Sequence, residues 1–269
     1  MGRFVLIHKS YYLYGAKTTL RPIFLLHTHH INNMKRHLLA TLLLLAPIVA
    51  AAQVRLSIDE KSVQVADGKK KTSERSIYLH PDGRMVVEQH SPKHSITHSN
   101  ALGEMRIYTP STGEVVVIND SEMASTKELV SLFASGGYVD MALPAYGYTQ
   151  SEVRHENGMI IKTFVPKSSA GVAKVELAFR GQLPICMIYY NNKGETLRKV
   201  YFAQYEYGRI PMPMRITEIE YSPKRDSLVR LSTYSNLLFD AEANSEMFDW
   251  QVPADAKRID IDPNTLFAK

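Results

Sequence analysis

The chain has 269 residues, with 32 lysines and arginines against 27 aspartates and glutamates, and a formal net charge of +5. Six of the basic residues and no acidic residue fall in the first 52 positions, which leaves 26 basic and 27 acidic residues in 53–269. This balance excludes the broad basic face on which electrostatic binding to nucleic acid depends. The roughly 217 residues after the first 52 suit one all-β domain, and they contain no internal repeat or low-complexity linker.

Residues 34–52 have the composition of a secretory signal peptide. Lys35-Arg36 supply a basic start, Leu38–Ala52 is apolar except for one threonine, and three alanines close the segment. A basic region, an apolar region of roughly 7–15 residues and a small-residue cleavage site are the order of such a signal. A membrane-spanning helix needs about 20 apolar residues, and this run is shorter and contains Pro47. We therefore expect cleavage near Ala52/Gln53, with an uncleaved anchor as the less favoured alternative.

Residues 1–33 are interpreted as an extension upstream of the true translation start, because Met34 opens a complete signal. No cysteine follows the cleavage site, so the residue that carries the lipid of a bacterial lipoprotein is missing. The exported product is therefore expected to be a soluble periplasmic protein. The single cysteine, Cys186, lies in an apolar run and is expected to be a small buried residue without a catalytic role.

No element is predicted over 54–75, which is polar, β-prone only in part and poorly periodic, and Lys69–Lys71 are interpreted as a solvated turn. From there on, short β-prone runs alternate with turn residues such as Pro81-Asp82-Gly83. Regular spacing of this kind predicts an antiparallel meander. The expected strands are 76–80, 84–90, 94–99, 104–110 and 114–120.

One short amphipathic helix is expected to interrupt the strands. Ser125 and Glu128 form the sequence pattern of a capping box, and an apolar stripe follows. Gly136-Gly137 is expected to end this helix, because glycine is favoured just after a helical C-terminus.

The second half predicts at least five consecutive antiparallel strands between about 147 and 239. Turns are expected at Glu156–Gly158, Arg180-Gly181, Asn191–Gly194 and Ser222–Lys224. A meander of this length is expected to curl on itself.

Several of these strands are apolar on both faces. In 200–207, Val200 and Phe202 point one way while Tyr201 and the other tyrosines point the other way, and 185–190 has no polar residue. A one-sided sheet would alternate apolar and polar residues. Something must therefore cover the second face, either a second layer of protein or an apolar ligand in a lined cavity.

No catalytic, metal or cofactor site is predicted. His90, His94 and His98 are spaced by four, but Pro92 lies between them and the flanking residues favour extended chain, so we interpret them as solvated. Glu218 and Glu220 share one strand face that continues as a polar one, and solvent exposure is expected for both. Nucleophile-elbow, phosphate-loop and zinc-protease motifs are missing from the sequence.

The closing segment 248–262, FDWQVPADAKRIDID, resembles the end of the LolA-like family of periplasmic outer-membrane lipoprotein carriers. Phe248, Trp250 and Pro253 stand at the positions of that family's aromatic-x-aromatic and proline pattern. The hairpin at 190–207 and the early meander at 83–120 are also similar, so the resemblance covers about 75–262.

The resemblance implies a mainly β protein, a strongly curved antiparallel sheet or unclosed β-barrel. One or a few short helices would cap a concave face that binds acyl chains. It also implies a non-enzymatic transport role in outer-membrane biogenesis of a Gram-negative envelope. The chain departs from the family at its start, where an amphipathic helix is missing, and no functional arginine is assigned, since Arg84 and Arg106 both fit.

We therefore expect 53–269 to form a single LolA-like domain, a monomeric carrier of lipid or lipoprotein acyl chains that releases its cargo to an envelope protein. One alternative is a non-enzymatic envelope interaction module with a packed β core and no ligand. Another is a secreted hydrolase with a scattered site. The expected cavity wall combines strand residues with three residues of a capping helix: Met187, Tyr189, Tyr201, Phe202, Tyr205, Tyr207, Met214, Leu129, Leu132 and Phe133.

Overall fold

The computed structural model describes residues 54–120, 124–168, 171–222 and 227–259, and every structural statement below concerns these residues. The predicted extension and signal peptide lie outside them. Among the described helices, none combines the length and the apolar character needed to span a membrane.

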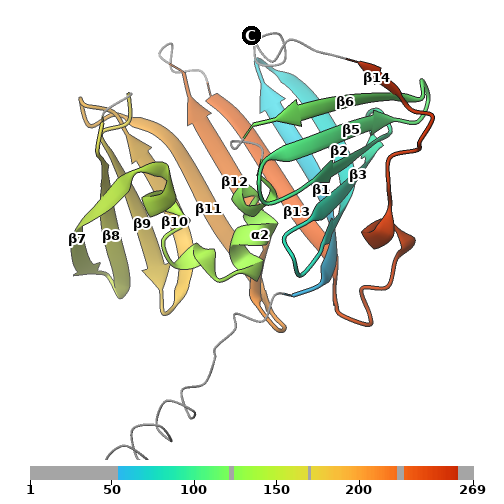
Figure 1. Cartoon of the computed structure of the whole chain (residues 1–269). Coiled ribbons are helices and arrows are strands. Elements are labelled where there is room, and N and C mark those ends of the chain that lie inside the picture. Colours follow the sequence, from blue (N-terminus) through green and yellow to red (C-terminus); the bar gives the residue numbers. More distant parts are fainter. Residues whose placement is uncertain (1–53, 121–123, 169–170, 223–226, 260–269) are drawn as a thin grey trace, which may run out of the picture. The chain divides into compact units, whose positions relative to one another are not determined.

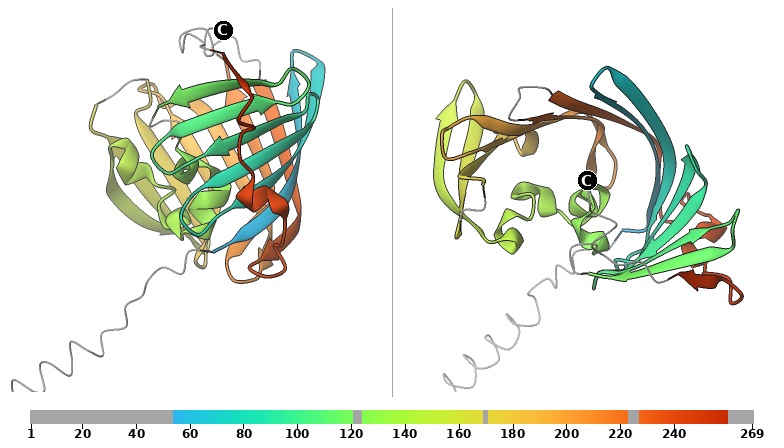
Figure 2. Two further views of the ribbon diagram at one scale, coloured as in Figure 1. Left: turned by 45° about the vertical axis from the view of Figure 1, so that its right-hand side comes forward. Right: turned by 90° about the horizontal axis from the view of Figure 1, so that it is seen from above.

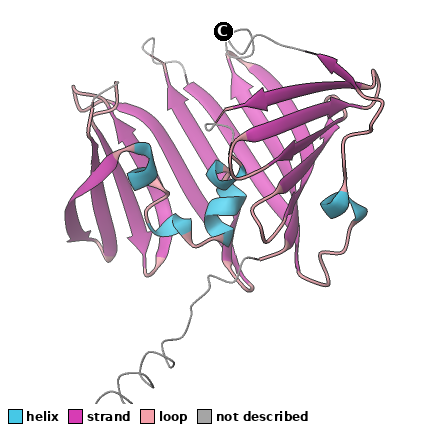
Figure 3. Ribbon diagram, in the orientation of Figure 1, coloured by secondary structure: helices cyan, strands magenta, loops and turns pink. Residues whose placement is uncertain are grey.

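The described residues form one strongly curved sheet that does not close (Figure 1). Strands dominate and the helices are short (Figure 3). The mainly β, unclosed and strongly curved architecture expected from the sequence is confirmed. In chain order the strands are β1 Leu56–Ala66, β2 Lys69–Leu79, β3 Met85–Ser91, β4 Ser95–Ser99, β5 Glu104–Thr109, β6 Glu114–Asn119, β7 Tyr148–Glu156, β8 Met159–Pro166, β9 Lys174–Arg180, β10 Leu183–Tyr190, β11 Thr196–Tyr207, β12 Pro211–Tyr221, β13 Ser227–Phe239 and β14 Lys257–Ile259.

The first described strand, β1, lies in the middle of the sheet, and the two halves of the sheet are built in opposite orders, one from the centre outward and the other from the edge inward. Strands β1 to β6 form one half as a meander, and the chain then crosses to the far edge. Strands β7 to β13 return from that edge, and β13 pairs antiparallel with β1 at the centre. The short β14 adds to β6 in parallel. The two halves are therefore joined by strands that lie far apart in the sequence.

The described hairpin turns follow the predicted turn residues, while the predicted turn at Ser222–Lys224 lies mostly outside the described residues. Asn157 and Gly158 both have positive φ, which suits the tight turn between β7 and β8. The expectation of no regular element over 54–75 is wrong, because this segment forms β1 and most of β2. The turn between these two strands is Asp67-Gly68, with φ values of 49° and 69°, so Lys69–Lys71 begin β2 and do not form the turn.

The crossing segment lies in the hollow of the curved sheet (Figure 2). It contains η2 Ser125–Lys127, α2 Leu129–Ala134, η3 Gly137–Val139 and η4 Leu143–Tyr146. Short helices thus cap the concave face, as expected. The predicted capping box is wrong: Glu128 is extended and makes no side-chain capping bond, so α2 begins only at Leu129.

The Ser125 hydroxyl, the other member of that box, donates a hydrogen bond to the Gly83 carbonyl and so ties the crossing segment to the sheet. The predicted glycine stop is confirmed, since Gly136 follows α2 with φ of 77°.

The closing segment packs on the convex side of the sheet, outside β1 to β5 (Figure 2). The Phe248 ring, in η5 Glu246–Asp249, lies 5.5 Å from the ring of Tyr78 and 4.0 Å from the guanidinium carbon of Arg55. The Trp250 ring lies 5.9 Å from that of Tyr108. The aromatic pair on which the family resemblance rests therefore fastens the chain end to the outside of the sheet.

Candidate ligand-binding site

A cavity of about 570 Å³ lies on the concave face, between the sheet and the start of α2. Its volume falls within the roughly 300–1,000 Å³ that small-molecule sites occupy. Residues of seven strands line it, together with Glu128, Leu129 and Val130. The cavity is therefore built by the curvature of the sheet and covered by the short helix.

The strand register sorts the lining residues into rows that run across the strands. One row passes from β10 to β2 through Met187, Val200, Glu218, Arg230, Gln64 and Lys71. The next passes from β11 to β2 through Phe202, Ile216, Ser232, Ser62 and Ser73. In the first row the apolar residues lie on β10 and β11, and the polar residues begin with Glu218 on β12 and continue to β2. In the second row the apolar residues lie on β11 and β12, and the polar residues lie on β13, β1 and β2. The cavity thus has one apolar wall and one polar wall.

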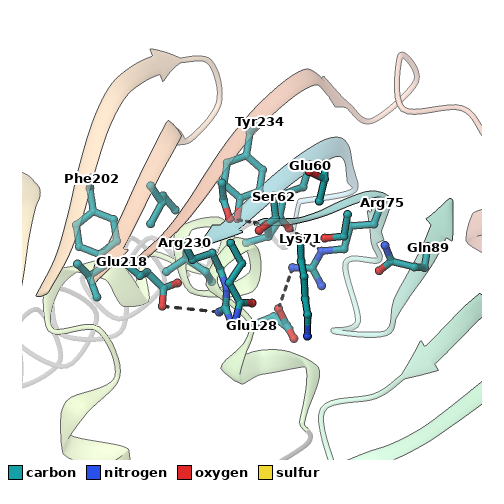
Figure 4. A pocket seen from close by; sticks show the side chains of 18 of the residues that line it. Glu60, Ser62, Lys71, Arg75, Gln89, Glu128, Phe202, Glu218, Arg230 and Tyr234 are labelled. Carbon is teal, nitrogen blue, oxygen red and sulfur yellow. Dashed lines mark hydrogen bonds and ion pairs between the residues drawn. The ribbon is translucent and has the colours of Figure 1, made fainter. Parts of the chain in front are cut away.

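The polar wall contains an ion pair between the buried Glu60 on β1 and the partly buried Arg75 on β2 (Figure 4). Arg75 Nε donates to Glu60 Oε2 at 2.6 Å, and the Ser232 hydroxyl donates to Glu60 Oε1 at 2.7 Å. Arg75 also lies 4.0 Å from Glu128 at the start of α2. Burial disfavours the charged guanidinium, but the two carboxylates outweigh it, and the pKa of Arg75 lies above its ordinary value. Arg75 therefore stays charged, and it faces a carboxylate side chain on Glu60 that is only 6% exposed.

A second group of charges stands where the two walls meet. Glu218 Oε2 accepts a hydrogen bond from Arg198 Nη2 at 2.6 Å and lies 3.9 Å from Arg230 Nη1. The expected solvent exposure of Glu218 is wrong, since its side chain is 18% exposed and lines the cavity. Glu220, two residues further along β12, is exposed as expected. The concave face is thus far more polar at its centre than the family resemblance implies.

The structure separates the expected wall residues into three sets. Met187, Phe202 and Leu129 line the cavity. Five others belong to the core beside the cavity or pack against it. They are the fully buried Phe133 together with Leu132, Tyr189, Tyr205 and Met214. Tyr201 and Tyr207 lie outside the site, with 39% and 76% of their surface exposed. Tyr201 alternates with the inward-facing Val200 and Phe202, so it points to the convex side.

Sequence patterns missed Glu60, Arg75 and Arg230 as residues of the site. A usable signal is present in β1, where Leu56 and Ile58 are buried on the concave face and Glu60 follows at the same period of two. A strand whose inward face changes from apolar to polar is what a partly polar cavity requires.

The candidate histidines do not assemble into a metal site. His90 Nε2 lies 2.9 Å from the Ser76 hydroxyl, and His94 Nε2 lies 3.0 Å from Glu88 Oε1. Burial, and next the charge of Arg106, hold the pKa of His98 below its ordinary value. No cluster of three or more metal-binding side chains occurs in the part of the chain that the structure describes.

Cys186 is expected to react slowly with thiol reagents. Burial in β10 raises the pKa of its thiol to about 11, so the reactive thiolate is scarce at neutral pH. Alkylation by iodoacetamide at pH 8 should be roughly a hundredfold slower than for an unstructured cysteine, whose pKa is about 8.5. The protein unfolded in urea supplies the matched rate. Equal rates in the folded and unfolded protein would show that Cys186 is not shielded.

Comparison with known proteins finds likeness of structure only. No protein-family model matches the chain, and no curated protein matches it. A DUF1329 family protein from Desulfovibrio piger matches with a TM-score of 0.49 at 17% identity, over 74% of this chain and 90% of that chain.

Two further matches are proteins of the kind that the sequence resembles. A LolA superfamily protein from Nitrosomonas europaea matches with a TM-score of 0.46 at 13% identity, over 81% of this chain and 91% of its own. A domain assigned to outer-membrane lipoprotein sorting, from Vibrio parahaemolyticus, matches with a TM-score of 0.48 at 16% identity, over 72% of this chain and 89% of its own. These values describe similarity of the backbone fold alone.

Proposed function

We propose that this chain is a non-enzymatic periplasmic binding protein that carries the acyl part of a lipid or lipoprotein in its concave cavity. The observation that carries the proposal is the apolar wall of a 570 Å³ cavity beneath α2. Met187, Val200, Phe202 and Ile216 form this wall, and Leu129 and Val130 face it from the helix. A packed module without a ligand would leave no such space on the face that its helices cover.

The size of the apolar wall sets the affinity to expect. Burial of one methylene contributes about 0.8 kcal/mol, so about ten methylenes contribute about 8 kcal/mol before the costs of association. An affinity near or weaker than micromolar follows for a single alkyl chain, because about 8 kcal/mol corresponds to about 1 µM. Binding of that strength suits a carrier, which has to release its cargo to an envelope partner.

The predicted signal peptide at 34–52 places this cargo in the periplasm. Its missing lipid-attachment cysteine supports a carrier that moves between membranes. The exposed rim of the cavity offers cargo an entry without unfolding of the sheet, because the sheet is not closed.

Substitution of Leu129 by aspartate is expected to weaken alkyl binding about tenfold or more, because it places a carboxylate against the apolar tail. An acidic residue at the first position of a helix is compatible with folding, which makes this site suitable. Isothermal titration with laurate and with dodecyl maltoside, below their micelle concentrations, measures the effect. Native mass spectrometry of the purified protein reports any lipid that co-purifies.

The matched control is Tyr207→Asp, which adds the same charge at an exposed aromatic of β11 and should leave alkyl binding unchanged. If the unsubstituted protein binds neither laurate nor dodecyl maltoside and carries no lipid, the proposal is wrong and the ligand-free module is correct.

A further inference from the structure

The charges that line the cavity are unevenly paired. Four cationic side chains and three carboxylates face it. Arg75 lies between two of these carboxylates, 2.6 Å from Glu60 and 4.0 Å from Glu128. The remaining three cations, Lys71, Arg198 and Arg230, share the single carboxylate of Glu218.

Glu218 does not satisfy these three cations. It accepts a hydrogen bond from Arg198 Nη2, but Arg230 Nη1 stays 3.9 Å away, beyond hydrogen-bonding distance. Arg198 Nε is buried without a hydrogen-bond partner, and the exposed Glu220 is no closer to it than 3.9 Å. Lys71 makes no ion pair within the described parts of the chain. Buried donors are normally satisfied, so Arg198 Nε is short of an acceptor. Lys71 is exposed and 41% of the Arg230 side chain is exposed, so both cations are accessible to an anion that enters from solvent.

The register brings two of these cations to the same place. Arg230 on β13 pairs with Gln64 on β1, which pairs with Lys71 on β2. Neighbouring strands lie about 4.8 Å apart, so the two cations flank Gln64 at about 10 Å between backbones, within reach of their long side chains. Figure 4 shows Arg230 and Lys71 entering the cavity on the side of Glu128. An anion between them would meet a guanidinium, an ammonium and the amide of Gln64.

The same row leads from these cations to the apolar wall. From Arg230 it continues through Glu218 to Val200 and Met187, three strand spacings or about 14 Å away along the sheet. A ligand that lies across the strands would therefore have its polar end at Arg230 and Lys71 and its apolar end at Met187. The row has cations at one end and apolar side chains at the other, as an anionic amphiphile has a charged head and an apolar tail. It therefore determines which way the ligand points as well as which kind of ligand fits.

We propose that the cavity selects an amphiphile with an anionic head, a carboxylate or a phosphate on an alkyl chain, held by Arg230 and Lys71. Guanidinium and ammonium groups bind both anions through charge-assisted hydrogen bonds. This assignment rests on the proposed function, since it requires the tail to occupy the apolar wall. It adds to the proposed function the chemical class of the ligand's head group and the residues that bind it.

Titration with twelve-carbon probes tests the assignment on the intact protein. Dodecyl phosphate and laurate are expected to bind about tenfold or more tightly than dodecyl maltoside and dodecyltrimethylammonium, because one charge-assisted hydrogen bond suffices for such a factor. The two anions distinguish phosphate from carboxylate. Inorganic phosphate alone tests whether the site serves a free anion.

The double variant Arg230→Gln/Lys71→Gln should lose the preference for anions while its affinity for dodecyl maltoside stays unchanged. The matched control is Arg215→Gln/Lys70→Gln, which removes an arginine and a lysine from the convex face of β12 and β2. Circular dichroism confirms that both variants fold. The probe series on the unsubstituted protein decides the question even where the variant does not fold.

Equal binding of all four alkyl probes would overturn the anionic assignment and leave the proposed function intact. A preference for dodecyltrimethylammonium would overturn it as well. Inorganic phosphate that binds as tightly as dodecyl phosphate would also overturn it, because the tail would then contribute nothing. Binding of none of the alkyl probes would instead overturn the proposed function.

Discussion

Replacement of Arg75 by methionine should lower the free energy of unfolding by about 3–5 kcal/mol, the range observed when one partner of a buried ion pair is removed. Glu60 would then keep the hydrogen bond from the Ser232 hydroxyl but lose its cationic partner. Solvent cannot replace that partner, because only 5% of the Glu60 side chain is exposed. The double variant Arg75→Met/Glu60→Gln should recover most of this loss, because no uncompensated charge remains. Urea unfolding of the three proteins measures the difference.

The same two strands provide the control. Lys61 and Glu74 form the next cross-strand pair, on the opposite face, with 61% and 49% of their side chains exposed. Lys61→Met should change stability little, because solvent screens an exposed pair. An Arg75→Met effect as small as that of Lys61→Met would show that Glu60 is solvated and that the polar wall is open to water.

The meander was predictable because local signals determine it. Turn residues such as Asn157-Gly158 stand where the chain reverses, and β-prone runs fill the stretches between the turns. The long-range pairing of β1 with β13 was not predictable, since no local pattern encodes which strands far apart in the sequence meet. The length of the meander and the local helix pattern predicted a curled sheet and a short helix, and the family resemblance added that the sheet is an unclosed barrel with the helix on its concave face.

The strand β1 was missed because polar residues of the cavity interrupt its pattern. Leu56 and Ile58 face inward as apolar residues, but Glu60, Ser62 and Gln64 continue the inward face as polar residues. The alternation of apolar and polar residues that would identify a half-buried strand therefore ends after Ile58. Glu218 was assigned to solvent for the same reason, since a polar residue on a strand normally faces water. Local rules are expected to fail at functional sites, and here both failures lie in the cavity.

The faces of β11 show a second limit. Val200 to Tyr207 is apolar on both sides, so composition could not tell Phe202 from Tyr201 as the lining residue. The register decides between them, because Phe202 pairs with the buried Ile216 and Tyr201 with Thr217. The expected second layer does not cover all tyrosines of β11, because Tyr201 and Tyr207 are exposed.

Phe133 is the contact on which the position of α2 depends. Its ring is fully buried and lies 5.2 Å from Tyr138, 6.0 Å from Phe202 and 6.2 Å from Tyr205. A six-residue helix has little stability of its own, so this packing holds α2 against β11. The helix in turn supplies Leu129 and Val130 to the cavity.

Phe133→Ala should therefore reduce the free energy of unfolding by about 3–5 kcal/mol, the usual cost of removing a buried phenylalanine. It should also accelerate amide exchange in 129–134 and weaken binding of dodecyl phosphate, because the cover of the cavity loses its anchor. Tyr207→Ala, which removes an exposed ring from β11, should alter none of these three quantities. Loss of stability with unchanged exchange in α2 and unchanged ligand affinity would mean that Phe133 supports the sheet alone. The apolar wall would then bind its ligand without help from the helix.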